Sequence, residues 1–364
     1  MPALLARLPL LVLLTILAWT PGVAAEEDAP FPPKGADEPK PEVPKPEPVT
    51  PEPVTPEPAA AEPAARPPAT HKPWSDELRA FCAERKIAIK EHGDAQIKLL
   101  LIGGAQAKVP DILRLAKQTL DGYELWSGQQ EIFSRKVPIE SETYHLVVFK
   151  NDGDYTALID HFRAKKLMDA PEGTEDLAKK VAGFPRPRMM FSKQPIAELL
   201  PENWAIYSTS CLALDAFYSS RSGKRRGPAW IREGMAAEMQ RLQCKGAIKC
   251  TTIAYEDNKE AAVDNWPREV ANMLSRHDPK LVTASSAMRM QLDALAGAHY
   301  RQMWSLLSFV RQNCGTKKGP ENKFLRLLVA TAGGTDSVEA VKSILGVSDP
   351  GLTDKWHAYI RDLK

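Results

Sequence analysis

The stretch YSTSCLALDAFYSSRSGKRRGPAWIREGMAAEM, from Tyr207 to Met239, contains one half of a pattern typical of metal-dependent hydrolases. Its second part predicts a helix on which Glu233 is suited to be a zinc-ligand carboxylate. Zinc hydrolases of the H-E-x-x-H type place two imidazoles one helical turn apart on a preceding helix, with a glutamate between them as the base. No histidine lies between His161 and His277, so the first half of that pattern is missing.

The segment PAWIREGMA, from Pro228 to Ala236, resembles the second site helix of the peptidase MA-like gluzincins and their bacterial relatives of unknown function, which typically reads P-x-W-x-x-E-G-x-A. The segments KLLLIGG, YHLVVFKNDGDYTAL and AHYRQMWSLLSFV, and closing helices that end in W-x-x-Y, follow in the order that this family shows. The resemblance covers residues 99–363. It implies a zincin-like α+β fold with a small N-terminal mixed sheet and a mainly helical C-terminal half.

The same resemblance places the H-E-x-x-H window on STSCL if the family's spacing is kept. Ser208, Thr209 and Leu212 would then stand where the family has histidine, glutamate and histidine. A hydroxyl is a poor zinc ligand, threonine is no general base at neutral pH, and leucine has no donor atom. We therefore expect a degenerate site with no metal or other cofactor, in which these three residues face Glu233 from a helix over residues 207–219.

Without metal partners, Glu233 is expected to favour the helix dipole or to pair with a nearby arginine, such as Arg232 or Arg226. Removing a carboxylate in such a surface role would cost only about 0.3–1 kcal/mol. Three further residues of the motif are expected to pack the fold rather than to contact substrate: Trp230, Gly234 and Ala236.

Other chemistry at this place has less support from the residues. Ser208, Ser210 and Cys211 are nucleophilic types, but nothing resembles the G-x-S-x-G elbow and no partner base can be located. Asp215 and Glu233 together offer a cation two carboxylates, although two carboxylates alone seldom hold zinc. An active hydrolase with a rearranged site therefore stays open as the alternative.

The first 73 residues indicate export followed by a spacer. Residues 1–25 place Arg7 before an apolar run and end in Val23-Ala24-Ala25, which is typical of a cleavable signal peptide. The run is shorter than the ~20 residues that a membrane span needs, so no transmembrane domain is expected after cleavage. An uncleaved anchor is the alternative. Residues 26–73, with the repeat PEPVTPEPVTPEP, predict a disordered Pro/Glu-rich linker.

The folded part is expected to span residues 74–364. The segments QIKLLLIGG and TYHLVVFKN predict strands that are each followed by a helix, RPRMMFS offers a further strand, and the rest is almost wholly helical. Strands early and helices late favour an α+β fold over a repeating α/β fold.

Charge and cysteine content narrow the functional classes. The chain has 48 basic and 46 acidic residues, a net charge of +2. It therefore lacks the excess of basic residues that is typical of nucleic-acid-binding proteins. Its five cysteines, in an exported chain, predict disulfides. Cys244 and Cys250 are the expected pair because CKGAIKC closes a short loop around a glycine, whereas Cys82, Cys211 and Cys314 cannot be paired from the sequence.

These features predict a periplasmic or extracellular protein, associated with the cell envelope, that binds or scaffolds rather than cleaves. Its partner would be a protein or peptide segment in the cleft that a peptidase uses for an extended chain. Two alternatives remain: an active metal-dependent or rearranged-site hydrolase, and a structural envelope protein with no ligand.

Overall fold

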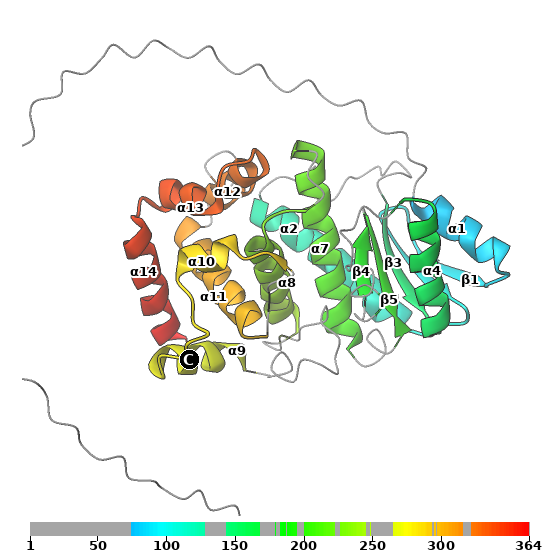
Figure 1. Cartoon of the computed structure of the whole chain (residues 1–364), viewed down its shortest axis with the longest axis horizontal. Helices are drawn as coiled ribbons and strands as arrows, with labels where there is room; N and C mark the ends of the chain where they lie inside the picture. The colour runs from blue at the N-terminus through cyan, green and yellow to red at the C-terminus, as the bar shows by residue number, and fades with distance from the viewer. Residues whose placement is uncertain are drawn as a thin grey trace, which may run out of the picture. The chain divides into compact units, whose positions relative to one another are not determined.

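The computed structural model describes residues 74–127, 143–167, 179, 183–186, 188–194, 200–222, 226–244, 248, 265–292, 295, 297–315 and 322–363. They form the predicted α+β fold, with a mixed sheet built from the N-terminal part and a mainly helical C-terminal half (Figure 1). The expected signal peptide and linker lie outside the described residues. Within the described ranges, no helix combines the length and the apolar character needed to cross a membrane.

The sheet has five strands in the order β1-β2-β3-β5-β4. The three central strands, β2, β3 and β5, are parallel, and the two outer strands pair antiparallel to their neighbours. Their bounds are β1 Ile89–Gly93, β2 Ile97–Ile102, β3 Tyr144–Phe149, β4 Gly183–Arg186 and β5 Met189–Lys193.

Both faces of the sheet are buried, which explains the unbroken apolar runs of its central strands. Neighbouring residues of a strand point to opposite faces, so Leu146 and Val147 belong to two different apolar clusters. Helices α1 (Trp74–Glu84) and α4 (Asp152–Ala164) contribute to the Val147 cluster. Helices α2 (Val109–Ser127) and α7 (Pro201–Ser222) contribute to the Leu146 cluster. The sheet therefore separates two cores, and α7 links the larger one to the helical half.

The helical half begins beside α7. Helix α8 packs against both α7 and α11, and is therefore central in this half (Figure 1). The helices are α8 Ala229–Gln243, α9 Trp266–Ser275, α10 Ala284–Arg289, α11 Gly297–Cys314, α12 Lys323–Ala332, α13 Ser337–Leu345 and α14 Asp349–Asp362.

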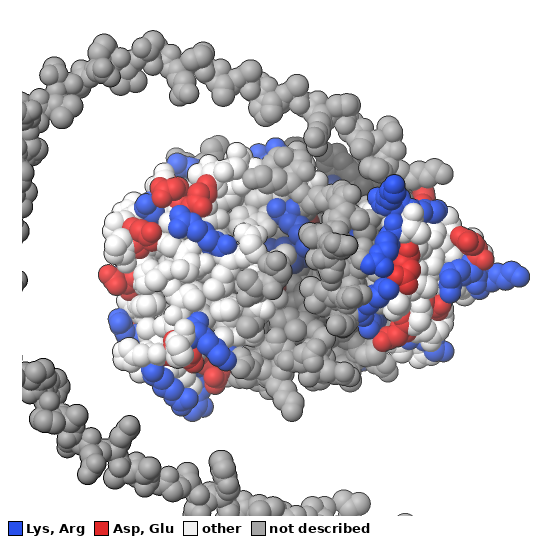
Figure 2. All heavy atoms as spheres, in the orientation of Figure 1, with Lys and Arg blue, Asp and Glu red and all other residues white. Residues whose placement is uncertain are grey.

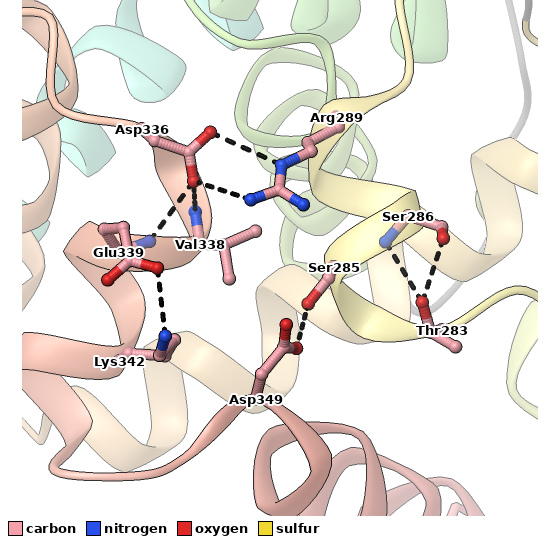
Figure 3. Close-up of polar contacts among 9 residues, drawn as sticks. All are labelled: Thr283, Ser285, Ser286, Arg289, Asp336, Val338, Glu339, Lys342 and Asp349. Carbon is pink, nitrogen blue, oxygen red and sulfur yellow. Dashed lines mark hydrogen bonds and ion pairs between the residues drawn. The ribbon is translucent and has the colours of Figure 1, made fainter. Parts of the chain in front are cut away.

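Polar caps fix the last helices against each other (Figure 3). Asp336 caps α13 by accepting hydrogen bonds from the backbone N–H groups of Val338 and Glu339, and it also pairs with Arg289 of α10. Ser285 of α10 donates to Asp349 at the start of α14. One aspartate thus satisfies helix-end N–H groups and joins two helices at the same time.

Candidate functional site

Helix α8, which carries the Glu233 motif, is buried over most of its length. Trp230 and Ala236 have no exposed surface. Gly234 lies where α8 meets α11, and a Cβ atom there would stand 2.7 Å from the Cβ of Leu307 and 2.8 Å from the backbone oxygen of Met303. A side chain at this position would clash, so the glycine permits the close approach of the two helices.

Four ionisable side chains meet in the interface between α7 and α8. The hydroxyl of Tyr207 donates to Glu233 Oε2 at 2.6 Å, and Arg232 Nη1 donates to Glu233 Oε1 at 2.6 Å. Arg232 Nε reaches Oδ1 of Asp215 at 3.3 Å. We call Tyr207, Asp215, Arg232 and Glu233 the arginine cluster. Each of its members is at most 6% exposed, so the polar contacts form in a largely water-free environment.

Helix periodicity explains why α7 supplies these partners. Tyr207, Cys211 and Asp215 follow each other at intervals of four residues, so they share one face of the helix. Burial raises the pKa of the Cys211 thiol strongly, although the positive charge of Arg232 acts to lower it. Burial also raises the pKa of Asp215, against the lowering effect of Arg232. The thiol is therefore protonated at neutral pH, and the face presents a neutral tyrosine and a neutral cysteine to Glu233.

The helix expected over residues 207–219 is present and longer, since α7 runs from Pro201 to Ser222. Ser208, Thr209 and Leu212 are buried in α7, but the hydrogen bond from α7 to Glu233 comes from Tyr207. Tyr207 and Cys211 lie one turn apart on the same face of α7. That Ser208, Thr209 and Leu212 face Glu233 stays a prediction.

The expectation that Glu233 lies at the surface, where its removal would cost little stability, is wrong. Glu233 is 2% exposed, and its partner Arg232 is equally buried. Its pairing with Arg232 does occur, but inside the protein, where breaking an ion pair costs more free energy than breaking a surface pair. The sequence could not show this burial because arginine and glutamate are rarely fully buried.

A second buried carboxylate of α8 was missed entirely from the sequence. Glu238 has no exposed surface and accepts hydrogen bonds from Trp304 Nε1 at 2.9 Å, Ser308 Oγ at 3.1 Å and Arg311 Nη2 at 2.9 Å, all from α11. Arg241, one turn further along α8, adds contacts of 2.9 and 2.8 Å. Despite burial, these donors keep the pKa of Glu238 below its usual value. Glu238 is thus a saturated anion that joins α8 to α11.

The possibility of a metal centre can be tested on these side chains. Both oxygens of Glu233 already accept short hydrogen bonds, and a guanidinium cation lies next to the carboxylate. Across the ranges that the structure describes, no three His, Cys, Asp or Glu side chains gather as a metal-binding group. The side chains around Glu233 therefore fit the guanidinium of Arg232 that is already bound there. They do not fit a zinc ion, which needs three or four nitrogen, sulfur or oxygen ligands.

Of the two cysteines in the expected disulfide, the structure describes only Cys244. Cys244 is a half-buried free cysteine at the end of α8, while Cys250 lies outside the described residues. Cys82, Cys211 and Cys314 are buried and free. The pairing of Cys244 with Cys250 stays a prediction.

A scan against protein-family models and a search of curated proteins find no match to this chain. The resemblance to the gluzincins stays a prediction that rests on the order of the motifs in the sequence.

Proposed function

We propose that this protein is an exported, catalytically inactive relative of the gluzincins, whose folded part acts as a binding or scaffolding module in the cell envelope. The proposal joins the export signal and spacer expected in residues 1–73 to the arginine cluster.

One observation carries the proposal: the guanidinium of Arg232 lies beside Glu233, the residue that would be the metal-ligand glutamate. A charged arginine 2.6 Å from that carboxylate repels a divalent cation and supplies the positive charge that a metal would bring. Tyr207 fills the other carboxylate oxygen, so the pair is held without a metal. In this arrangement, both oxygens of Glu233 accept hydrogen bonds from protein side chains.

The rival function, a hydrolase with a rearranged site, receives no support from the same residues. Cys211 is the strongest nucleophile type in the cluster, but desolvation raises its pKa, which keeps it in the unreactive thiol form. Thr209 Oγ1 is buried and has no hydrogen-bond partner among the described residues, so none of them acts as its base.

The face of the folded part seen in Figure 2 carries basic and acidic side chains interspersed, with neither sign covering it. Such a surface, with the net charge of +2, favours a protein or peptide partner over nucleic acid. The proposed partner is a polypeptide segment.

A peptidase assay tests the proposal. The full chain, with and without added zinc, is incubated with a mixture of peptides, and the products are read by mass spectrometry. We expect no cleavage from the wild type, from Glu233→Gln or from Glu339→Gln, an exposed control. Zinc-dependent cleavage that disappears in Glu233→Gln but persists in Glu339→Gln would overturn the proposal.

A further inference from the structure

Helix α1 covers one face of the sheet together with α4. Its buried side chains, Leu78, Phe81 and Cys82, belong to the apolar cluster that contains Val147. The two helices pack against each other and lie side by side in Figure 1. Because α1 is the first element of the described chain, it can leave the sheet more easily than an element in the middle of the fold.

One carboxylate at the start of α1 is shared by two side chains of α4. Oε1 of Glu77 lies 2.7 Å from Nε2 of His161 and 2.5 Å from Nζ of Lys165. The side chains of Glu77 and His161 are each 15% exposed, so water screens this contact less than one at the open surface. A second ion pair of α1, from Arg79 to Glu91 of β1, is more exposed. Glu77 is therefore the better shielded of the two polar contacts.

The charges around this carboxylate make its contact sensitive to acid. Other charged side chains of α1, α4 and β4 lie nearby: Asp76, Asp160, Arg163 and Arg186. The hydrogen bond from Lys165 does most to hold the pKa of Glu77 below its ordinary 4.5, and burial opposes it. The contribution of Glu77 to the contact is therefore present above pH 4.5 and is lost as the pH falls through the lowered pKa. Once Glu77 is neutral, His161 and Lys165 are two cations that face each other without an anion, and they repel.

We propose that α1 is an acid-sensitive latch: protonation of Glu77 loosens α1 from α4 and uncovers the sheet face that carries Leu100, Ile102 and Val147. The step adds one proton from solvent to a carboxylate oxygen and breaks no covalent bond, so it reverses when the pH rises. These three side chains belong to the cluster that α1 helps to bury. Opening of the latch therefore exposes an apolar surface that is covered at neutral pH.

Hydrogen–deuterium exchange of the full chain at about pH 6.5 and about pH 3.5 tests the proposal, with each rate divided by that of the unfolded chain at the same pH. We expect protection of the α1 amides to fall about tenfold at the lower pH, as is typical for loss of a charge-assisted contact. Protection of α12 should stay unchanged. Helix α12 is the internal reference, because it contains no acidic residue and its cap, Asn322, does not titrate.

Three variants assign the effect to its residues. Glu77→Gln should give low protection of α1 at both pH values, whereas Glu84→Gln, an exposed position of the same helix, should behave like the wild type. His161→Gln keeps a neutral N–H donor and should reduce the loss in acid, because one of the two facing cations is gone.

The possible results separate the latch from general acid denaturation. Equal protection of α1 at the two pH values overturns the proposal, and a fall that persists in Glu77→Gln overturns the role of Glu77. A parallel fall in α12 means that the whole fold opens in acid, which overturns local release. A loss in His161→Gln as large as in the wild type overturns the part assigned to repulsion.

Discussion

Glu233 and Glu238 are two buried carboxylates on one helix, five residues apart, and they have very different surroundings. Glu238 faces α11 and accepts hydrogen bonds from four side chains, two of them arginines. Glu233 faces α7 and shares one buried arginine with Asp215. Each oxygen of Glu238 accepts at least two hydrogen bonds, whereas the hydrogen bonds to Glu233 among the described residues are one to each oxygen.

The difference lies in how many donors each carboxylate engages. A carboxylate with all its lone pairs engaged has no capacity left for a ligand, so the Glu238 contacts serve the packing of α8 on α11. The position of a carboxylate on α8 thus says little about its role, and the number of hydrogen-bond donors around it says more.

The largest expected effect is at Glu238. Glu238→Gln turns an amide N–H₂ toward donors that need an acceptor, and should lower the free energy of unfolding by about 3–5 kcal/mol. Glu233→Gln should cost less, about 1–3 kcal/mol, because its amide N–H₂ can donate to the Tyr207 oxygen while its carbonyl still accepts from Arg232. Urea denaturation of both variants measures the two values. A larger loss at Glu233 would reverse the assignment of the structural carboxylate.

Gly234→Ala should have the next largest effect. The added methyl would meet the backbone of α11 at 2.8 Å, and overpacking of this kind costs about 1–3 kcal/mol. Gly153→Ala in α4 is the matched control, because nothing lies within 4 Å of a Cβ there. That substitution should be neutral or stabilise the helix by up to about 1 kcal/mol. Equal melting temperatures for the two variants would mean that α8 and α11 are not so close.

Tyr207→Phe should remove one hydrogen bond from Glu233 without creating a cavity. The expected loss is about 1–2 kcal/mol, since Glu233 Oε2 becomes a buried acceptor without this donor. Ser208→Ala, the neighbouring position, serves as the control for the register. If Ser208→Ala were the more damaging change, the contact face of α7 would be the one expected from the sequence and not the one in the structure.

The smallest effects concern pH. The pKa of Glu238 lies below its ordinary 4.5 in the folded protein, so its contribution to stability is present above that pH and is lost as the pH falls further. The pKa of Asp215 is raised above 3.8, so its contribution has the opposite sign and declines as the pH rises from 3.8. Glu238→Gln should therefore flatten the rise of stability with pH in this acidic range, and Asp215→Asn should steepen it. Denaturation at several acidic pH values tests this; identical slopes would contradict it.

The fold class could be predicted because its signals are local. The runs LLLI and LVVF, each followed by a helical pattern, identify central strands of a sheet covered on both faces. The edge strand β1 lacks such a signal, since only two of its five residues are half-buried and the rest are exposed. Edge strands depend on pairing with a neighbour, which the sequence does not display.

The sequence places Glu233 and the expected facing residues on two helices that do pack together, but it does not identify Tyr207 as the side chain that bonds to Glu233. Helix spacing fixes which residues share a face, but not how that face is rotated toward its neighbour. Ser208 and Tyr207 differ by one position, and this rotation decides which of them meets Glu233. A combination of signals could have found the answer: Tyr207, Cys211 and Asp215 at intervals of four, opposite the adjacent pair Arg232 and Glu233.

The metal content of the purified full chain tests the central claim, that Arg232 takes the place of a metal at Glu233. Elemental analysis after dialysis against zinc and then against buffer should give well below about 0.1 zinc per chain, both in the wild type and in Glu233→Gln, because the cluster lacks the three or four ligands of a zinc site. One zinc per wild-type chain, lost in Glu233→Gln, would contradict the account.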